Sequence, residues 1–289
     1  VIMDGNAGSC NSLTISGTAN WTSALTTNVG AGGIVINPGG NITGSVSAVL
    51  TTTGGLVLNS TLTSTLINIR IITTPGQTIS GTGTLSRLDI STNTTNNGSI
   101  TVTTALTSTV PSVLTQAASA TLTYNATTAI APTLDATATG NTVVYGGTTQ
   151  TVKSTTYQNL TLSGSAVKTL GGAITVNGNL AINSCELYTS TFQITGNASG
   201  TFTINGAGIL TLGNNASATD VLFPTNFITA NISFSSTSIV YYYGNSAQTI
   251  SSVPAYGNLR IQNYSGSKSA DGNINVLTAV IVTSPTVFD

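Results

Sequence analysis

The chain offers few side chains that could carry out acid–base or nucleophilic chemistry. Of its 289 residues, seven are Asp or Glu, six are Lys or Arg, and none is His. Glycan-cleaving sites need two acids that converge on the scissile bond, and a serine nucleophile ordinarily needs a histidine base. The acids here are scattered, and no two are closer than 18 positions: Asp4, Asp89, Asp135, Glu186, Asp220, Asp271 and Asp289. We therefore predict that the protein is not an enzyme.

Metal-binding patterns are equally sparse. The two cysteines, Cys10 and Cys185, lie far apart in the chain and form no zinc-type spacing. The sequence leaves open whether they pair. Calcium could use the oxygen atoms of Asp4-Gly5-Asn6 and Asp271-Gly272-Asn273, although such dipeptides are also common in plain turns. We predict no cofactor, with structural calcium at these triplets as the alternative.

The charge distribution excludes two classes of partner. The net charge is −1 and the six cations are scattered, so no basic patch can neutralise nucleic-acid phosphates or anionic lipid head groups. Apolar residues come in short runs, far below the roughly 20 residues of a membrane-spanning helix. We predict that the protein binds no nucleic acid and does not span a membrane.

The elements that must position any site are strands. Thr is the commonest residue with 56 copies, whereas Glu occurs once, and this balance favours strands over helices. Apolar residues recur with period two, as at Ile174 and Val176 and again at Leu180 and Ile182. We therefore predict strands of about three to six residues, each with one buried face, separated by Gly and Asn turns.

An imperfect repeat runs along the chain. Its copies begin at Gln77, Gln150 and Gln248, which are 73 and 98 residues apart. The second and third copies share further matched pairs: Tyr157 with Tyr256, Lys168 with Lys268, Ile174 with Ile274, and Val176 with Val276. The first copy lacks the Tyr. The repeats thus lie near 75–106, 141–182 and 239–282, with variable inserts between them.

Two all-β architectures fit this pattern. Tandem immunoglobulin-like β-sandwiches would suit the 98-residue spacing, but they favour longer strands. A parallel β-solenoid, or β-helix, suits the short strands, the dense turns and the stacked Thr, Ser and Asn. We predict the solenoid as one elongated repetitive β domain over 1–289, with tandem sandwiches as the alternative.

The most regular stretch carries a family resemblance. The string YQNLTLSGSAVKTLGGAITVNGNLAI, residues 157–182, resembles the Thr, Asn and Gly-rich repeats of large surface proteins secreted by Gram-negative gliding bacteria and their relatives, an adhesin-like β-solenoid group. The resemblance covers mainly 75–106, 141–214 and 239–282. It implies export to the cell surface and a stalk or fibre role, and it brings no catalytic residues with it.

Aromatic side chains form one candidate contact surface. Tyr241, Tyr242 and Tyr243 are consecutive, so in a strand Tyr241 and Tyr243 share one face and Tyr242 points to the other. Tyr at a surface favours protein contacts or stacking on sugars. Surface glycans are therefore one predicted class of partner.

The chain ends form the other candidate surface. A solenoid's terminal coil exposes unpaired backbone groups, which a helix or charged edge normally covers, and the sequence shows neither device. We predict subunit contacts through apolar terminal residues: Val1, Ile2, Val276, Leu277, Val280, Ile281, Val282, Val287 and Phe288. A contact of this kind between the two ends generates a head-to-tail homopolymer.

Together these patterns predict an extracellular structural protein, the subunit of a cell-surface filament or adhesin stalk. We expect it at the cell surface or outside the cell, after removal of an export signal that this chain does not contain. A carbohydrate-binding or tailspike-like β-helix is the alternative, and an ice-binding protein with flat Thr ranks is a third hypothesis.

Overall fold

The structure is a β-solenoid built from parallel strands, which confirms the predicted fold class over the sandwich alternative. It is a computed structural model that describes residues 2–3, 8–22, 24, 26–44, 47–64, 67–71, 75–217, 219–262 and 266–283. The chain divides into two compact units, residues 1–143 and 144–289, called unit 1 and unit 2 below. That the whole chain acts as one domain stays a prediction.

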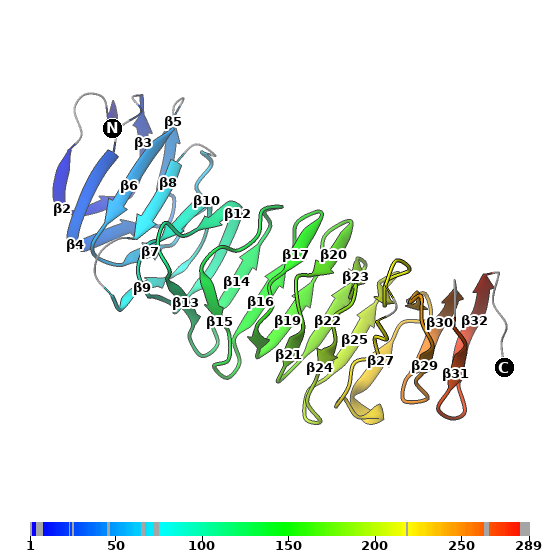
Figure 1. The fold of residues 1–289 in the computed structure, drawn as a ribbon. Helices are drawn as coiled ribbons and strands as arrows, with labels where there is room; N and C mark the ends of the chain where they lie inside the picture. Colours follow the sequence, from blue (N-terminus) through cyan, green and yellow to red (C-terminus); the bar gives the residue numbers. More distant parts are fainter. Residues whose placement is uncertain are drawn as a thin grey trace. The chain divides into compact units, whose positions relative to one another are not determined.

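Unit 1 consists of strands joined by turns (Figure 1). They are β1 (Ile2–Met3), β2 (Ser9–Ile15), β3 (Thr18–Trp21), β4 (Thr26–Ile36), β5 (Asn41–Gly44), β6 (Ala48–Thr52), β7 (Leu56–Leu58), β8 (Ile67–Ile71), β9 (Gln77–Ser80), β10 (Thr82–Ile90), β11 (Thr94–Asn96), β12 (Ser99–Thr107), β13 (Val113–Gln116), β14 (Thr121–Tyr124) and β15 (Thr133–Asp135). Most of these strands have two to five residues, but four exceed the predicted six, with 7 to 11 residues. The boundary between the units falls within β16 (Thr142–Tyr145).

Unit 2 has the same construction and one 3₁₀ turn, η1 (Thr229–Asn231). Its strands are β17 (Gln150–Val152), β18 (Thr156–Tyr157), β19 (Asn159–Leu162), β20 (Val167–Leu170), β21 (Ile174–Val176), β22 (Leu180–Asn183), β23 (Glu186–Tyr188), β24 (Ile194–Thr195), β25 (Phe202–Asn205), β26 (Ile209–Leu212), β27 (Ile232–Phe234), β28 (Ile239–Tyr242), β29 (Gln248–Ile250), β30 (Ala255–Gln262), β31 (Lys268–Ala270) and β32 (Asn275–Thr283).

Strand register shows how the coils stack. In unit 1, Ile34 pairs with Leu56, one coil of 22 residues later. In unit 2, Leu160 pairs with Leu180, and Leu180 pairs with Phe202. Each residue therefore lies beside its counterpart in the next coil, about 4.8 Å away. Apolar residues lie above apolar ones, and this matching fixes the register, because a slip by one residue would turn the buried face outward.

The coils of unit 2 carry separate sheets on different faces. Strands β17, β20, β23, β26, β28, β30 and β32 form a seven-stranded parallel sheet, and β18, β21 and β24 form a three-stranded one. Strands β17, β20 and β23 run side by side in Figure 1. The outward face of the seven-stranded sheet carries Tyr241, one of the tyrosines singled out above.

Most of the predicted core residues are buried. Ile174, Val176, Leu180 and Ile182 are at most 2% exposed, which confirms the period-two pattern. Their third-repeat counterparts Ile274 and Val276 are only half-buried. The reason is position, because Val276 lies on β32, which among the described strands pairs only with β30.

One coil of unit 2 is much longer than its neighbours. Ile209 pairs with Ile239, 30 residues later, whereas Ile239 pairs with Asn258 after 19. The additional residues include Phe223 and Phe227, which pack on Phe202 at ring-centroid distances of 5.8 and 5.4 Å. Gly196 leaves the room that this needs, since a Cβ there would lie 2.3 Å from the Phe227 ring.

Candidate functional site

Two of the described acids form contacts that stabilise the local structure. Asp89 is buried and accepts a hydrogen bond from Arg70 Nε at 2.7 Å. Asp135 accepts from the backbone N–H and the hydroxyl of Thr137, within its own turn. Among the residues described, no group of three or more His, Cys, Asp or Glu could hold a metal ion.

The two predicted calcium triplets have different outcomes. Asp4-Gly5-Asn6 lies outside the described residues. In the other triplet, Asp271 Oδ1 accepts the backbone N–H of Ser252 at 2.6 Å, a turn-stabilising contact. Calcium at Asp271 therefore stays a prediction. Both cysteines are free thiols, with Cys10 exposed and Cys185 buried.

The second and third repeats form the same buried polar cluster, which we call the tyrosine clamp. In the second repeat, the hydroxyls of Tyr145 and Tyr157 are hydrogen-bonded at 3.1 Å. The Tyr145 hydroxyl accepts the backbone N–H of Lys153 at 3.0 Å, and the Tyr157 hydroxyl donates to the Lys153 carbonyl at 2.6 Å. The two hydroxyls thus satisfy the backbone N–H and carbonyl of Lys153, a task that strand pairing performs elsewhere in the coil.

A lysine completes the clamp. Lys168 has no exposed surface, and its Nζ donates to the carbonyls of Gly147 at 2.6 Å, Thr148, and Ser165 at 3.0 Å. Gln150 Oε1 accepts the backbone N–H of Gly147 at 2.9 Å. One ammonium and one amide thereby satisfy the backbone groups of a buried turn.

The third repeat reproduces these contacts. Tyr242 and Tyr256 are hydrogen-bonded through their hydroxyls at 3.0 Å. The Tyr242 hydroxyl accepts the backbone N–H of Ser251 at 3.0 Å, and the Tyr256 hydroxyl donates to the Ser251 carbonyl at 2.6 Å. Lys268 Nζ donates to the carbonyls of Gly244, at 2.9 Å, and Ser246. Burial lowers the pKa of Lys268 to about 8 and raises the pKa of Tyr242 to about 12. The clamp is therefore a structural device.

The three consecutive tyrosines alternate as predicted. Tyr242 is fully buried in the clamp, whereas Tyr241 and Tyr243 are half-buried on the outward face, with ring centroids 4.9 Å apart. Tyr242 was predicted as part of the contact surface together with its neighbours. Its burial removes it from that surface, because alternate residues of a strand face opposite sides.

Tyr241 and Tyr243 line a hollow on the seven-stranded sheet, which we call the aromatic groove. Its main lining residues are Glu186, Tyr188, Tyr241, Tyr243, Arg260 and Gln262, around a cavity of about 550 Å³. Strand register explains the grouping: Tyr188 pairs with Thr211, Thr211 with Tyr241, and Tyr241 with Arg260. Four successive strands therefore present one column of outward side chains.

The groove contains one cation and one anion. The Arg260 guanidinium carbon lies 4.5 Å from the centroid of the Tyr241 ring, a cation–π contact. Arg260 Nε is buried and has no hydrogen-bond partner among the described residues. At the other end of the groove, Glu186 Oε1 accepts the hydroxyl of Thr211 at 2.7 Å. Tyr241 donates to Gln262 Oε1 and so tethers its ring.

The predicted subunit-contact residues cluster on β32. Leu277, Val280, Ile281 and Val282 are 57%, 52%, 43% and 46% exposed, and Val276 is half-buried. The structure places Ile2 on β1, where its backbone pairs with Asn20. Val1, Val287 and Phe288 lie outside the described residues. Five of the nine predicted contact residues therefore lie on the single strand β32.

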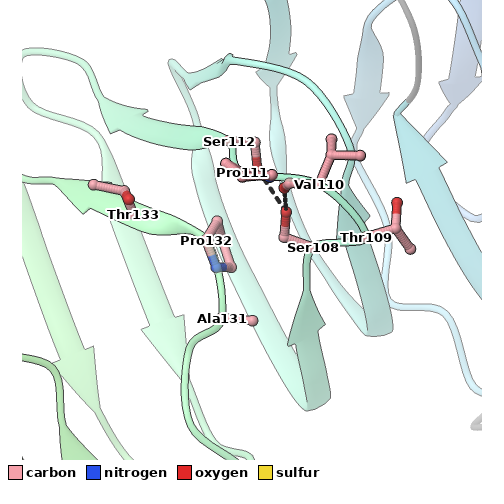
Figure 2. Close-up of a pocket in the computed structure, with 8 residues that line it drawn as sticks. All are labelled: Ser108, Thr109, Val110, Pro111, Ser112, Ala131, Pro132 and Thr133. Atoms are coloured by element: carbon pink, nitrogen blue, oxygen red, sulfur yellow. Dashed lines mark hydrogen bonds between the residues drawn. The ribbon is translucent and has the colours of Figure 1, made fainter.

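A further hollow lies in unit 1 (Figure 2). It has a volume of about 300 Å³ and is lined by residues 108–112 and 131–133. The hydroxyls of Ser108 and Ser112 are hydrogen-bonded to each other at 2.9 Å, and Ser112 also donates to the Ile90 carbonyl at 2.7 Å. Its lining carries no charged side chain, so we assign it no ligand.

Comparison with protein-family models, with curated proteins and with solved structures finds no match to this chain. In the part of the chain that the structure describes, no helix has the length and apolar character needed to cross a membrane. The assignment of a site therefore depends on the geometry of the chain itself.

Sequence reasoning missed two groups of residues. Glu186, Tyr188 and Arg260 are distant in sequence and meet in the groove only through coil stacking. A register of about 20 residues per coil, applied outward from Tyr241, would have placed Arg260 next to it. Tyr145 and Tyr242 were also missed as repeat members, because they lie five and six residues before the matched glutamines.

Proposed function

We propose that the protein is an extracellular structural protein, a subunit of a cell-surface filament or adhesin stalk that associates end to end through its terminal strands. The solenoid fold is compatible with such a role. Parallel coils satisfy backbone groups by stacking, and the scarcity of charge, 4% of residues, makes the fold insensitive to salt. The protein is a scaffold and has no catalytic activity of its own in this proposal.

The observation that carries the proposal is the uncovered core at β32. Val280 and Val282 pair in register with Leu259 and Ile261, which are buried core residues of β30. Side chains in one column of a solenoid point the same way. Val280 and Val282 therefore continue the core column, yet both are about half exposed.

An exposed core column favours association. No other described strand pairs with the edge of β32 that faces away from β30, so this edge offers a row of backbone groups. Burial of an apolar side chain contributes about 1.5–3 kcal/mol relative to full exposure. A coil of a second copy that stacks on β32 would cover these side chains and extend the ladder. Because that contact does not close on itself, it generates a filament.

The test introduces charge into the core column. In this proposal the intact chain forms filaments at high concentration, visible by negative-stain microscopy and by sedimentation. The double variant Val280→Lys, Val282→Lys should remain monomeric and folded, because two ammonium groups would be buried in the contact. Val110→Lys is the control, since Val110 is also 48% exposed but lies in unit 1, in the turn between β12 and β13.

Two results would refute the mechanism. One is an intact chain that stays monomeric at high concentration. The other is a double variant that still polymerises as fast as the Val110→Lys control. Secretion is tested separately, by locating the natural protein in fractions of its source cells.

A further inference from the structure

We propose that the aromatic groove binds an acidic glycan, with sugar rings stacked on its tyrosines and a carboxylate held by Arg260. This binding activity goes beyond the scaffold role and does not depend on self-association, since the groove lies on the outward face of the seven-stranded sheet. Three features of the groove support the proposal: the column of outward tyrosines, the Arg260 guanidinium without an ion-pair partner, and Glu186 at the opposite end of the groove.

The aromatic column suits the faces of sugar rings. Tyr188 and Tyr241 occupy the same outward column with Thr211 between them, so their separation is two strand spacings, or about 10 Å. Tyr243 widens the platform, because its ring lies 4.9 Å from that of Tyr241 at an angle of 46°. Aromatic rings with a polar edge offer an apolar face and a hydrogen-bonding rim to one ligand.

Arg260 determines the charge of the ligand. No carboxylate among the described residues forms an ion pair with Arg260, whereas Arg70 has Asp89. Arg260 Cζ lies 4.5 Å from the centroid of the Tyr241 ring, and a guanidinium matches a carboxylate with two parallel hydrogen bonds. Arg260 Nε is buried and has no partner among the described residues, so a ligand carboxylate contacts the two terminal nitrogens.

The far end of the groove favours hydroxyl groups. Glu186 lies three strands from Arg260 in the sheet, about 14 Å away. Its carboxylate already accepts one hydroxyl, from Thr211 at 2.7 Å, and retains capacity to accept more. A negative group there would repel a second acid, so the ligand presents its carboxylate at Arg260 and its hydroxyls at Glu186.

The lining favours a glycan over a protein partner. Protein interfaces are enriched in Tyr and Arg but depleted in Glu. Here Glu186 and the amides of Asn215 and Gln262 line the same hollow as the three phenols and the guanidinium. The volume of about 550 Å³ falls in the usual range for small-molecule pockets. A short acidic oligosaccharide fits this combination.

The experiment uses the full chain and two matched probes. Titration calorimetry compares a hexamer of galacturonic acid with the neutral hexamer of galactose. We expect the acidic hexamer to bind and the neutral one to bind at least about tenfold more weakly, the change produced by loss of one charge-assisted contact of about 1.4 kcal/mol.

Variants then assign the binding to the groove. Arg260→Gln should lower affinity for the acidic hexamer about tenfold and remove the preference over the neutral one. Tyr241→Ala should abolish measurable binding, while Tyr241→Phe should retain the stacking face and most of the affinity. Arg87→Gln, which removes an exposed arginine of unit 1, is the control and should bind normally.

Several outcomes would overturn the proposal: no binding of the acidic hexamer at millimolar concentration, equal binding of both hexamers, or unchanged binding by Arg260→Gln. Circular dichroism checks that each variant is folded. The Val280→Lys, Val282→Lys variant should bind the acidic hexamer normally, so failure of the filament proposal and failure of this one are distinguishable.

Discussion

The two units fill their coils with different buried polar groups. In unit 1, three neutral amides connect successive coils, and we call them the amide chain. Asn96 Nδ2 donates to the side-chain oxygen Gln116 Oε1 at 2.8 Å, and Asn141 Nδ2 donates to the backbone carbonyl of Gln116 at 3.2 Å. In unit 2, the tyrosine clamp uses phenols and a lysine, as with Tyr145 and Lys168. Both arrangements hold turns from within the coil.

The difference shows which backbone groups each device can satisfy. A side-chain amide both donates and accepts, so Asn and Gln can follow one another from coil to coil. A lysine only donates, and Lys168 therefore gathers three carbonyls of neighbouring turns around one nitrogen. The clamp can organise a wider turn, but it confines a charge that the amide chain avoids.

Removal of the clamp lysine should have the largest effect. Lys168→Met keeps most of the side-chain volume but leaves three buried carbonyls without their shared donor. We expect a loss of about 2–4 kcal/mol in the free energy of unfolding. The three unsatisfied carbonyls destabilise the fold, and removal of the buried charge offsets part of that cost. Urea unfolding followed by tyrosine near-UV circular dichroism measures it, since most of the tyrosines lie in unit 2.

Lys153→Met is the control for this measurement. Lys153 supplies its backbone N–H and carbonyl to the clamp, and methionine keeps both. We expect a change below about 1 kcal/mol, because the Lys153 side chain is only half-buried and its backbone contacts are kept. If Lys168→Met proves neutral or stabilising, desolvation of the ammonium outweighs its hydrogen bonds, and the clamp owes its stability to the tyrosines alone.

A rise in pH should change the stability of unit 2 but not that of unit 1, by a smaller amount than the lysine substitution. The pKa of Lys268 is about 8 in the folded chain, against 10.5 ordinarily. Between these values the unfolded chain binds a proton that the folded chain has released, so stability rises with pH. Above pH 10 the sign reverses, because the raised pKa of Tyr242, about 12, keeps a proton that the unfolded chain loses.

Unit 1 provides the comparison, since all three lysines lie in unit 2. Urea midpoints between pH 8 and 10 should rise when followed by tyrosine circular dichroism. They should stay level when followed by the fluorescence of Trp21, the single tryptophan, in unit 1. A Trp21 midpoint that rises in parallel would show that the two units unfold together. A tyrosine midpoint that does not rise between pH 8 and 10 would contradict the role of the lysines.

Interruption of the amide chain should have the smallest effect. Gln116→Met removes the acceptor of Asn96 Nδ2, but that nitrogen also donates to the Thr121 carbonyl at 3.2 Å. The substitution also removes Gln116 Nε2, which has no partner among the described residues. We expect a loss of about 1 kcal/mol or less, from Trp21 fluorescence in urea. Thr115→Val, on the outward face of the same strand, is the control.

The repeat predicted much of the fold, because its signals are local. Alternation at Ile174 and Val176 identified the buried face, and alternation at Tyr241 to Tyr243 identified which rings face outward. The short strands and dense turns distinguished a solenoid from sandwiches. Each of these features depends only on residues a few positions apart.

The groove and the role of the lysines were harder to predict. Lys168 and Lys268 were recognised as equivalent, but a lysine normally lies at the surface, and its burial follows from carbonyls some 20 residues away. Arg260 and Glu186 meet Tyr241 only after the register of several coils is fixed. The long coil between Ile209 and Ile239 breaks any constant spacing that would have revealed it.

That long coil also bears on how such chains diversify by mutation. Ile232 and Ile239 regain register with Phe202 and Ile209 after 30 residues, so a segment of the size of 213–231 can enter the gene at one turn without disturbing the coils on either side. A solenoid of this kind can gain loops by insertion while its repeat survives. The exposed part of the same segment, near Thr219 and away from the buried Phe223 and Phe227, offers protein engineers a place to display a foreign peptide.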